Sequence, residues 1–239
     1  RHGAGYDGVD LAAAREHGVL VCTAGGANAI SVAELTIFYM LYCSRNFKKV
    51  QKLYLEDYRQ AKMGVPKTEL EGKTLGLIGT GNIGKLVAKK AALGFDMKVV
   101  AYDPFARELP DYIQLTEDRD EVFRCADYVS LHVPATKDTV HSISDHEFDL
   151  MKESASRGKI VDEAALIRAL EAKKIAGAGL DVVEQEPFDL KNPLLKMENV
   201  LVAPHIGGAT KEASTRSSLA CAQAIDDFFS GRTPKFIVP

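Results

Sequence analysis

Short apolar runs alternate with helix-like patterns along most of this sequence. Runs of strand length occur at 19–22, 74–78, 98–102, 126–133, 176–182 and 199–203. Helical patterns occur at 11–17, 31–45, 47–63, 83–91, 117–125, 145–152, after Asp162 and at 211–229. Strands that alternate with helices are typical of a parallel sheet with helices on both faces. The pattern therefore predicts an α/β fold built on a doubly wound parallel sheet.

The helix expected at 31–45 is apolar around most of its circumference. Ser31 and Glu34 have the spacing of a capping box, which predicts Ser31 as the N-cap. The large apolar side chains are Leu35, Phe38, Tyr39, Leu41 and Tyr42. A helix of this kind is buried on more than one side, and a contact between subunits would bury it.

The stretch from Thr74 to Asp103 has the order of a dinucleotide-binding βαβ unit. An apolar run leads into Gly79-Thr80-Gly81-Asn82-Ile83-Gly84, a helical pattern follows, and a second apolar run ends at Asp103. Gly79 permits a tight turn, Gly81 lets backbone N–H groups approach a pyrophosphate, and Gly84 lets the helix pack closely on the sheet. The helix N-terminus also offers unpaired N–H donors to the phosphates.

Asp103 indicates which dinucleotide is bound. Its carboxylate can accept hydrogen bonds from both hydroxyls of the adenosine ribose, and it would repel a 2′-phosphate. We therefore expect NAD in preference to NADP. Arg107 is near enough in sequence to weaken this preference, although an arginine four residues later is more often simply solvated.

Composition excludes several classes of function. The 239 residues carry a net charge of −3, which gives no reason to expect a nucleic acid or an anionic membrane as partner. No apolar run is long enough to span a bilayer. The four cysteines are widely spaced, with no CxxC pair, and indicate reduced thiols in a cytoplasmic protein. No His, Asp, Glu or Cys cluster has the spacing of metal ligands, so no metal is expected.

Ligands of doubly wound sheets bind at the carboxyl ends of the strands. Asp103, His132, Asp181 and His205 each end an apolar run, and Arg157 and Glu186 lie in loops expected on the same side. Taken singly, each loop residue has an ordinary explanation, such as a solvated charge or a histidine that satisfies nearby backbone groups. His132 is expected to support the cofactor loop. The other histidines, His2, His17, His141 and His146, are expected at the surface or in turns.

Several segments resemble signatures of the D-isomer-specific 2-hydroxyacid dehydrogenases, and phosphoglycerate dehydrogenase-like members are the most similar. The segments are 3–10, Gly76–Gly84, Leu131–Thr136, Ser156–Glu163, Leu180–Pro187 and Pro204–Gly208. They occur in the family's order and cover nearly the whole chain. Six ordered segments are far more specific than a single glycine motif.

The resemblance implies an oxidoreductase that interconverts a D-2-hydroxy acid and its 2-keto acid, such as 3-phosphoglycerate or the glycerate and hydroxypyruvate pair. It implies His205 as the acid/base, Glu186 as the partner that orients the imidazole, and Arg157 as the donor to the substrate carboxylate. Since some relatives act as NAD-sensing corepressors without enzymatic activity, such a regulator is the alternative. Pairing of relatives through the region of helix 31–45 implies a homodimer.

The resemblance also implies a set of cofactor contacts. Asn82 and Ile83 lie at the pyrophosphate, Asp103 at the ribose, and Val133 and Pro134 beside the adenine and ribose. Asp181 accepts from the nicotinamide carboxamide. The full expected set is Gly79, Gly81, Asn82, Ile83, Gly84, Asp103, Val133, Pro134, Ala155, Ser156, Arg157, Asp181, His205, Gly207 and Gly208.

The expected domains are an NAD-binding Rossmann domain at 28–210 and an incomplete, flavodoxin-like substrate domain made of 1–27 and 211–239. Two departures from the family stand out. Family members begin with a further segment of the substrate domain, and they carry an apolar strand between the Met-Lys pair and the Ser-Arg-Gly segment, where Met151–Arg157 is too short. We expect additional residues at both places, and an intact mass equal to that of the printed sequence would contradict this.

Overall fold

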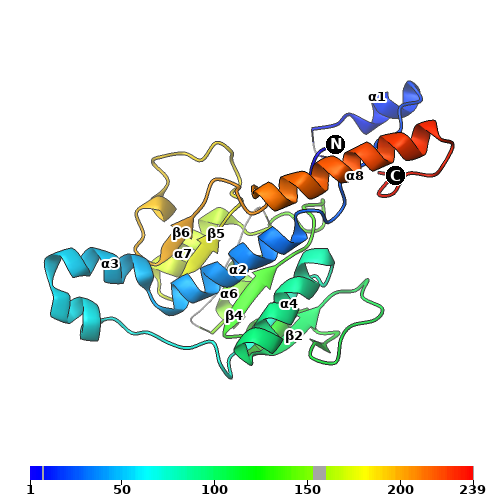
Figure 1. The fold of residues 1–239 in the computed structure, drawn as a ribbon. Coiled ribbons are helices and arrows are strands. Elements are labelled where there is room, and N and C mark those ends of the chain that lie inside the picture. The colour runs from blue at the N-terminus through cyan, green and yellow to red at the C-terminus, as the bar shows by residue number, and fades with distance from the viewer. Residues whose placement is uncertain (7, 153–159, 239) are drawn as a thin grey trace. The chain divides into compact units, whose positions relative to one another are not determined.

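The computed structural model describes residues 1–6, 8–152 and 160–238. The chain divides into two compact units, one made of residues 1–32 and 206–239 and the other of residues 33–205. The division lies near the domain boundaries expected from the sequence, and the assignment of each unit to cofactor or substrate stays a prediction. Each unit is described by itself below (Figure 1).

The larger unit contains a parallel sheet of four strands in the order β3-β2-β1-β4. These strands are β1 (Thr74–Ile78), β2 (Lys98–Tyr102), β3 (Gln114–Leu115) and β4 (Tyr128–Leu131). Leu75 of β1 is paired with Val99 of β2 on one side and with Tyr128 of β4 on the other. The parallel βαβ arrangement expected from the sequence is therefore confirmed, while the two-residue strand β3 was not predicted.

The strands β5 (Ala178–Leu180) and β6 (Val200–Val202) form a second parallel pair. Among the described residues β4 and β5 are not hydrogen-bonded neighbours, so the six strands fall into two parallel sheets. No described strand lies between them. The stretch at 151–157, where an additional strand was expected, falls largely outside the described residues.

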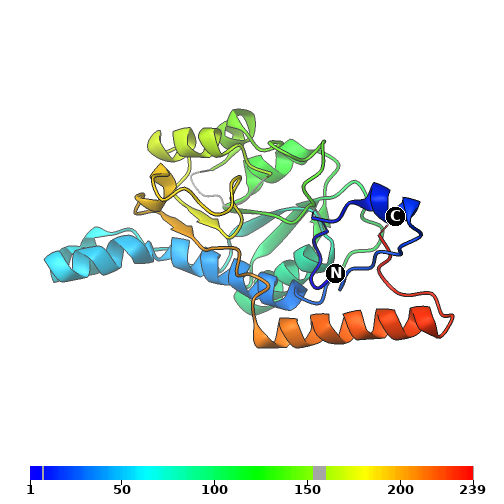
Figure 2. The ribbon, with the colours of Figure 1, turned by 90° about the horizontal axis from the view of Figure 1, so that it is seen from above.

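Helices lie on both sides of the strands of the larger unit (Figure 2), and each side has its own hydrophobic core. The first joins α2 (Ala29–Ser44) and α4 (Asn82–Phe95) to β1 and β2 through residues such as Ile37 and Val87. The second joins α5 (Arg119–Cys125), α6 (Asp145–Leu150) and α7 (Glu163–Glu171) to strands of both sheets. Helices on both faces and a parallel register define a doubly wound architecture.

Two helices start differently from the expectation. Helix α2 begins at Ala29, and the Ser31 hydroxyl lies 2.8 Å from the hydroxyl of Thr210, so Ser31 is not the N-cap. The polar helix expected at 47–63 is two helices, α3 (Phe47–Glu56) and the π-helix η1 (Gln60–Gly64). The break lies at Asp57, which is extended and whose carboxylate accepts from the N–H groups of Arg59 and Gln60.

The smaller unit contains α1 (Leu11–Glu16), the first residues of α2, and α8 (Lys211–Phe229), whose bounds match the prediction. The strand expected at 19–22 is wrong. Cys22 makes only an isolated antiparallel bridge to Ile237, and Val19 is 57% exposed. An apolar run becomes a strand only where a partner strand pairs with it over several residues. Within the described residues, no helix is long and apolar enough to cross a membrane.

Candidate active site

The glycine turn after β1 has the geometry that its sequence predicts. Gly79 has a φ of +93°, and a Cβ atom there would lie 2.7 Å from Cγ1 of Val133 and 2.8 Å from the carbonyl oxygen of His132. A Cβ atom on Gly84 would collide with the carbonyl oxygen of Gly79. Both positions therefore require glycine, the first for its positive φ and the second for the close approach of α4 to the turn.

Gly81 differs from these two glycines because a Cβ atom there would meet no described atom within 4 Å. It is the N-cap residue of α4, and Asn82 and Ile83 open the helix. The space beside Gly81 therefore adjoins the first N–H groups of α4, which have no partner within the helix and favour an anion. This open cradle fits a pyrophosphate.

Asp103 follows β2 and is joined to the glycine turn. Its Oδ2 accepts hydrogen bonds from the Thr80 backbone N–H at 2.7 Å and the Thr80 hydroxyl at 2.8 Å, and its Oδ1 accepts from Phe105 N–H at 2.9 Å. Burial by itself would raise the pKa of Asp103, but these hydrogen bonds outweigh it and lower the pKa below its ordinary value. The backbone N–H of Ala106 also stabilises this carboxylate, so four donors of the chain itself surround it.

His132 lies directly after β4, and its Nε2 is 3.0 Å from the Ser130 hydroxyl. Its backbone N–H donates to the carbonyl of Ile78 at the end of β1. These contacts hold the start of the loop that contains Val133 and Pro134 beside the glycine turn. They agree with the supporting role expected for His132.

His205 and Glu186 form an ion pair within the larger unit, with Nδ1 and Oε2 3.0 Å apart. The His205 side chain is 60% exposed and that of Glu186 is 35% exposed, so both are open to a ligand. His205 has a φ of +55°, a conformation that non-glycine residues adopt rarely and that is enriched at functional sites.

The pairing of β5 with β6 explains how these distant residues meet. Leu180 is paired with Val202, so the chain leaves both strands at the same edge of the sheet. The His205 N–H then donates to the carbonyl of Asp181 at 2.8 Å. Asp181 itself is only 4% exposed, so it is a buried residue directly after β5 whose backbone carbonyl holds the backbone of His205.

Comparison with known proteins shows to which family this chain belongs. The family model described as "D-isomer specific 2-hydroxyacid dehydrogenase, NAD binding domain" matches residues 37–207. The chain is 41% identical over 235 residues to hydroxypyruvate reductase of Thermotoga maritima, which covers 94% of this chain and 75% of that protein. The chain belongs to the D-isomer-specific 2-hydroxyacid dehydrogenase family. The predicted resemblance and the expected cofactor, NAD, are thereby confirmed, while the domain bounds 28–210 stay a prediction.

Further relatives lie in the same family. D-3-phosphoglycerate dehydrogenase of Archaeoglobus fulgidus is 40% identical over 240 residues, covering 97% of this chain but only 45% of the relative. The chain thus spans less than half of that relative's length. Among solved structures, D-2-hydroxyisocaproate dehydrogenase matches with a TM-score of 0.91 at 31% identity, covering 99% of this chain and 77% of that one. These matches confirm the α/β fold with its Rossmann-type NAD domain.

Most of the expected site residues lie in the larger unit, some lie in the smaller unit, and some lie outside the described residues. The glycine turn, Asp103, Val133, Pro134, Asp181, Glu186 and His205 all lie in the larger unit. Gly207 and Gly208 belong to the smaller unit, where a Cβ atom on Gly208 would lie 2.8 Å from Nδ2 of Asn28. Ala155, Ser156 and Arg157 lie outside the described residues.

Thr80 is the residue that sequence reasoning missed. It is 2% exposed and donates two hydrogen bonds to Asp103, which fixes the strand-end carboxylate against the glycine turn. A hydroxyl side chain between the first two glycines of a dinucleotide motif is the signal that would have indicated it. Within the described residues, no group of three or more His, Cys, Asp or Glu side chains is arranged to hold a metal ion.

Proposed function

We propose that this chain is the NAD-binding part of an NAD-dependent D-2-hydroxyacid dehydrogenase, which interconverts a D-2-hydroxy acid and its 2-keto acid. The observation that carries the proposal is the contact of 3.0 Å between His205 and Glu186 in a chain of this family. The names of the relatives favour glycerate with hydroxypyruvate, 3-phosphoglycerate with its keto acid, and glyoxylate as the first substrates to test.

His205 is the proposed acid/base. Glu186 is a carboxylate and can only accept, so the His205 Nδ1 carries the hydrogen of their contact. Nε2 is then the atom that exchanges a proton with the substrate oxygen, donating it during keto acid reduction and accepting it during oxidation. Glu186 orients the ring and stabilises the imidazolium that forms in the oxidative direction.

NAD, when bound, exchanges a hydride with C2 of the substrate. Asn82, Ile83 and Gly81 would hold its pyrophosphate at the N-terminus of α4, and Asp103 would accept from the adenosine ribose. The open space at Gly81 and the position of Asp103 beside the glycine turn support this fit. A carboxylate at this position also disfavours a 2′-phosphate, which supports NAD over NADP.

The remaining assignments rest on the family. Arg157 would bind the substrate carboxylate and polarise the carbonyl, and Ala155, Ser156 and Asp181 would surround the nicotinamide. Val133 and Pro134 would border the adenine and ribose, and Gly207 and Gly208 would let the backbone pass close to the ring. Residues 28–210 would form the NAD domain, and 1–27 with 211–239 would contribute to the substrate domain.

We also propose that the protein forms a homodimer in the cytoplasm. Phe38 on α2 is 49% exposed and Phe47 on α3 is 52% exposed, and their rings form a tilted aromatic chain with Tyr42 between them. Apolar rings exposed in this number favour burial against a second subunit. The four cysteines are free thiols, which supports a reducing compartment.

The test is NADH oxidation by the protein with hydroxypyruvate, 3-phosphohydroxypyruvate, glyoxylate and pyruvate, in parallel with His205→Ala. We expect one acid to be reduced and His205→Ala to lower kcat about 100- to 10,000-fold, the usual contribution of a general acid. His141→Ala is the matched control, because His141 also pairs with a carboxylate, that of Glu184, at 3.0 Å.

Equal loss in both histidine variants would contradict the assignment of His205. Tight NADH binding without turnover of any acid would instead favour the NAD-sensing regulator, which a search for bound partner peptides would then test. Exchanging NADH for NADPH in the same assay tests the role of Asp103. A preference for NADPH would contradict it.

A further inference from the structure

The segment that carries Glu186 is an exposed loop with a buried residue at each end. Val183 and Leu194, which are 5% and 0% exposed, belong to the hydrophobic core shared with α7. Apart from Phe188, the residues from 184 to 191 are exposed. Core packing therefore fixes the two ends of this loop, while the residues between them depend on individual polar contacts for their placement.

The first end of the loop is bound to helix α7. Oε1 of Glu184 accepts a hydrogen bond from the backbone N–H of Glu163 at 2.8 Å. Glu163 is the first residue of α7, so its N–H has no partner within the helix and a carboxylate is favoured there. The same oxygen lies 3.0 Å from Nε2 of His141, but this second contact joins two exposed side chains and contributes little.

The other end of the loop is bound to the same residue. The side-chain amide of Asn192 donates through Nδ2 to Oε1 of Glu163. Its Oδ1 accepts from the Leu194 N–H at 2.9 Å and so caps the short helix η2 (Pro193–Leu195). Because the amide oxygen is used by this cap, the amide NH₂ group is the part that faces Glu163.

The Glu163 side chain is directed at the loop, although an acid in the first turn of a helix ordinarily stabilises the helix through its charge alone. The side chain is partly buried, and Asn192 is 29 positions away in the sequence. Helix α7 is capped by another residue, since Asp162 is its N-cap and accepts from the Ala165 N–H at 2.9 Å. The start of the helix therefore does not explain the contact of Glu163 with Asn192.

We propose that Glu163 is a positioning residue for the candidate active site, because it holds both ends of the loop that carries Glu186. Its backbone N–H holds Glu184, and its carboxylate holds Asn192. Glu186 lies two residues after Glu184, and its Oε2 is 3.0 Å from Nδ1 of His205. The inference rests on the proposed function, in which His205 is the acid/base and Glu186 orients its ring.

Loss of the Glu163 carboxylate should free one end of the loop and let Glu186 move relative to His205. A displacement of about 1 Å at a catalytic group can lower a rate about 100-fold. Glu163 acts through the loop and not on the substrate, so substrate binding should be kept. The expected kinetic effect is therefore a lower kcat with a nearly unchanged KM.

The test compares Glu163→Ala with Glu171→Ala, because both carboxylates lie on α7 and Glu171, its last residue, is exposed. With the keto acid that wild type reduces, Glu163→Ala should lower kcat about 10- to 100-fold and change KM less than about threefold. Glu171→Ala should leave both values as in wild type. Glu163→Gln should keep kcat within about threefold of wild type, because its amide oxygen still accepts from Asn192.

A second pair of variants isolates the contact with Asn192. Asn192→Asp keeps the oxygen that caps η2, but it replaces the amide donor by a second carboxylate facing Glu163. It should lower kcat as Glu163→Ala does. Adding Glu163→Gln to it restores the hydrogen bond with donor and acceptor exchanged, so the double variant should recover most of the lost kcat.

The position of the hydrogen on the neutral His205 ring is a readout that needs no turnover. Glu186 can only accept, so their contact places this hydrogen on Nδ1. The ¹⁵N chemical shifts of the ring show which nitrogen carries it, and His205→Ala identifies the signal by its absence. We expect the Nδ1–H form to dominate in wild type and in Glu171→Ala, and to lose population in Glu163→Ala and Asn192→Asp.

The two readouts separate a failure of this inference from a failure of the proposed function. If a keto acid is reduced, and Glu163→Ala and Asn192→Asp keep both kcat and the Nδ1–H form, Glu163 is not a positioning residue. A fall in kcat without any change of the ring would also overturn the inference, since Glu186 would then still hold His205. If no acid is reduced but both variants lose the Nδ1–H form, the positioning role stands and the proposed function is wrong. Asn192→Asp decides between these outcomes even if Glu163→Ala fails to fold.

Discussion

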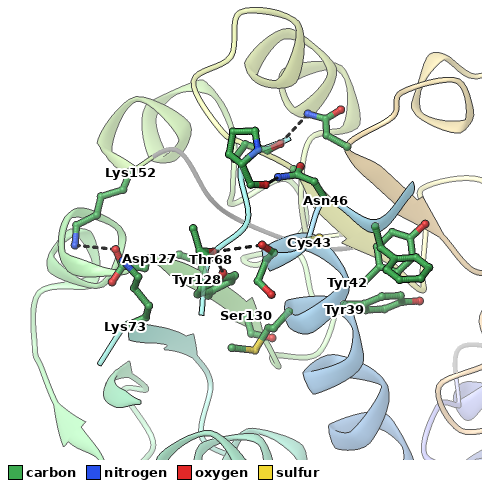
Figure 3. A pocket seen from close by; sticks show the side chains of 18 of the residues that line it. Tyr39, Tyr42, Cys43, Asn46, Thr68, Lys73, Asp127, Tyr128, Ser130 and Lys152 are labelled. Carbon is green, nitrogen blue, oxygen red and sulfur yellow. Dashed lines mark hydrogen bonds and ion pairs between the residues drawn. The ribbon is translucent and has the colours of Figure 1, made fainter. Parts of the chain in front are cut away.

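The carboxyl ends and the amino ends of the strands in the larger unit differ in how the space around them is filled. At the carboxyl ends, side chains from neighbouring strand ends contact one another, as Thr80 does with Asp103 and His205 with Glu186. At the amino ends between β4 and β5, two strand edges and a helix enclose a cavity of about 430 Å³. The carboxyl ends are joined by contacts between side chains, whereas a cavity separates the amino ends of β4 and β5 among the described residues (Figure 3).

The difference shows which contacts neighbouring residues in the sequence determine and which depend on residues far apart in the chain. The carboxyl-end contacts come from short motifs in which a strand, a turn and a polar residue follow one another directly. The amino-end cavity depends on which strands pair, and this is decided by residues far apart in the chain, such as Leu77 of β1 and Ser130 of β4. Three substitutions test this contrast.

The largest effect is expected from Gly84→Ala, with Gly81→Ala as its matched control. A Cβ atom on Gly84 meets a backbone carbonyl that cannot move aside, so we expect a loss of about 3 kcal/mol in the free energy of unfolding. Gly81→Ala should cost less than about 1 kcal/mol, since its Cβ meets nothing within 4 Å. It should instead weaken NADH binding about tenfold, at a cost of about 1.4 kcal/mol.

Urea denaturation and NADH titration of both variants measure these effects. If Gly84→Ala weakened NADH binding while leaving stability unchanged, the packing role of Gly84 would be wrong. If Gly81→Ala bound NADH normally, the pyrophosphate would not approach the turn at this position. The pair therefore separates the glycine needed by the fold from the glycine needed by the cofactor.

How far the sequence could predict this molecule follows from the same contrast. The βαβ unit was predicted with its strand bounds, because turn glycines and apolar runs act within about 30 residues. Helix α8 was predicted with both ends, since Thr210 caps it and Gly231 has the positive φ typical of a helix terminus. Residues close together in the sequence were sufficient to predict the βαβ unit and helix α8.

Prediction failed where a distant residue competes with a local one. Ser31 has the sequence of an N-cap, but its hydroxyl bonds with Thr210, 179 positions away. The strand expected at 19–22 has apolar residues but no partner strand of matching length. The hydroxyl between the first two glycines marks Thr80 locally, but its contact with Asp103 was missed because that contact depends on the register of β1 against β2.

A smaller effect is expected from Asp103→Asn, and it should depend on pH. The asparagine amide cannot accept all the hydrogen bonds of the carboxylate, so we expect a loss of about 1–2 kcal/mol in the free energy of unfolding at pH 7. The pKa of Asp103 is lower in the folded protein than its ordinary value of about 3.9. The stabilisation is therefore fully present above pH 4 and is lost as the pH falls through the folded pKa.

Urea denaturation of wild type and variant at pH 7, 5 and 3 measures this dependence. The difference between the two proteins should be the same at pH 7 and 5 and should shrink at pH 3. Thr80→Val is the matched control for the hydroxyl, because it removes the hydroxyl donor and keeps the hydrogen bond from the Thr80 backbone N–H. A difference that grows on acidification would contradict the lowered pKa.

The smallest effect is expected from Tyr39→Phe, where the side chain lines the cavity from α2 (Figure 3). The Tyr39 hydroxyl donates to the carbonyl of Leu180 at 3.3 Å, and the ring packs so closely on Gly179 that a Cβ there would lie 2.6 Å from Cγ of Tyr39. Phenylalanine keeps the ring contact. The Leu180 carbonyl also keeps its hydrogen bond from the Ala203 N–H at 2.7 Å, so the loss in the free energy of unfolding should be only about 0.5–1 kcal/mol.

Tyr54→Phe on α3 is the matched control, because this side chain is exposed and its substitution should not change the free energy of unfolding measurably. Urea denaturation measures both losses, and a loss above about 2 kcal/mol for Tyr39→Phe would show that the hydroxyl, and not the ring contact, holds β5 against α2.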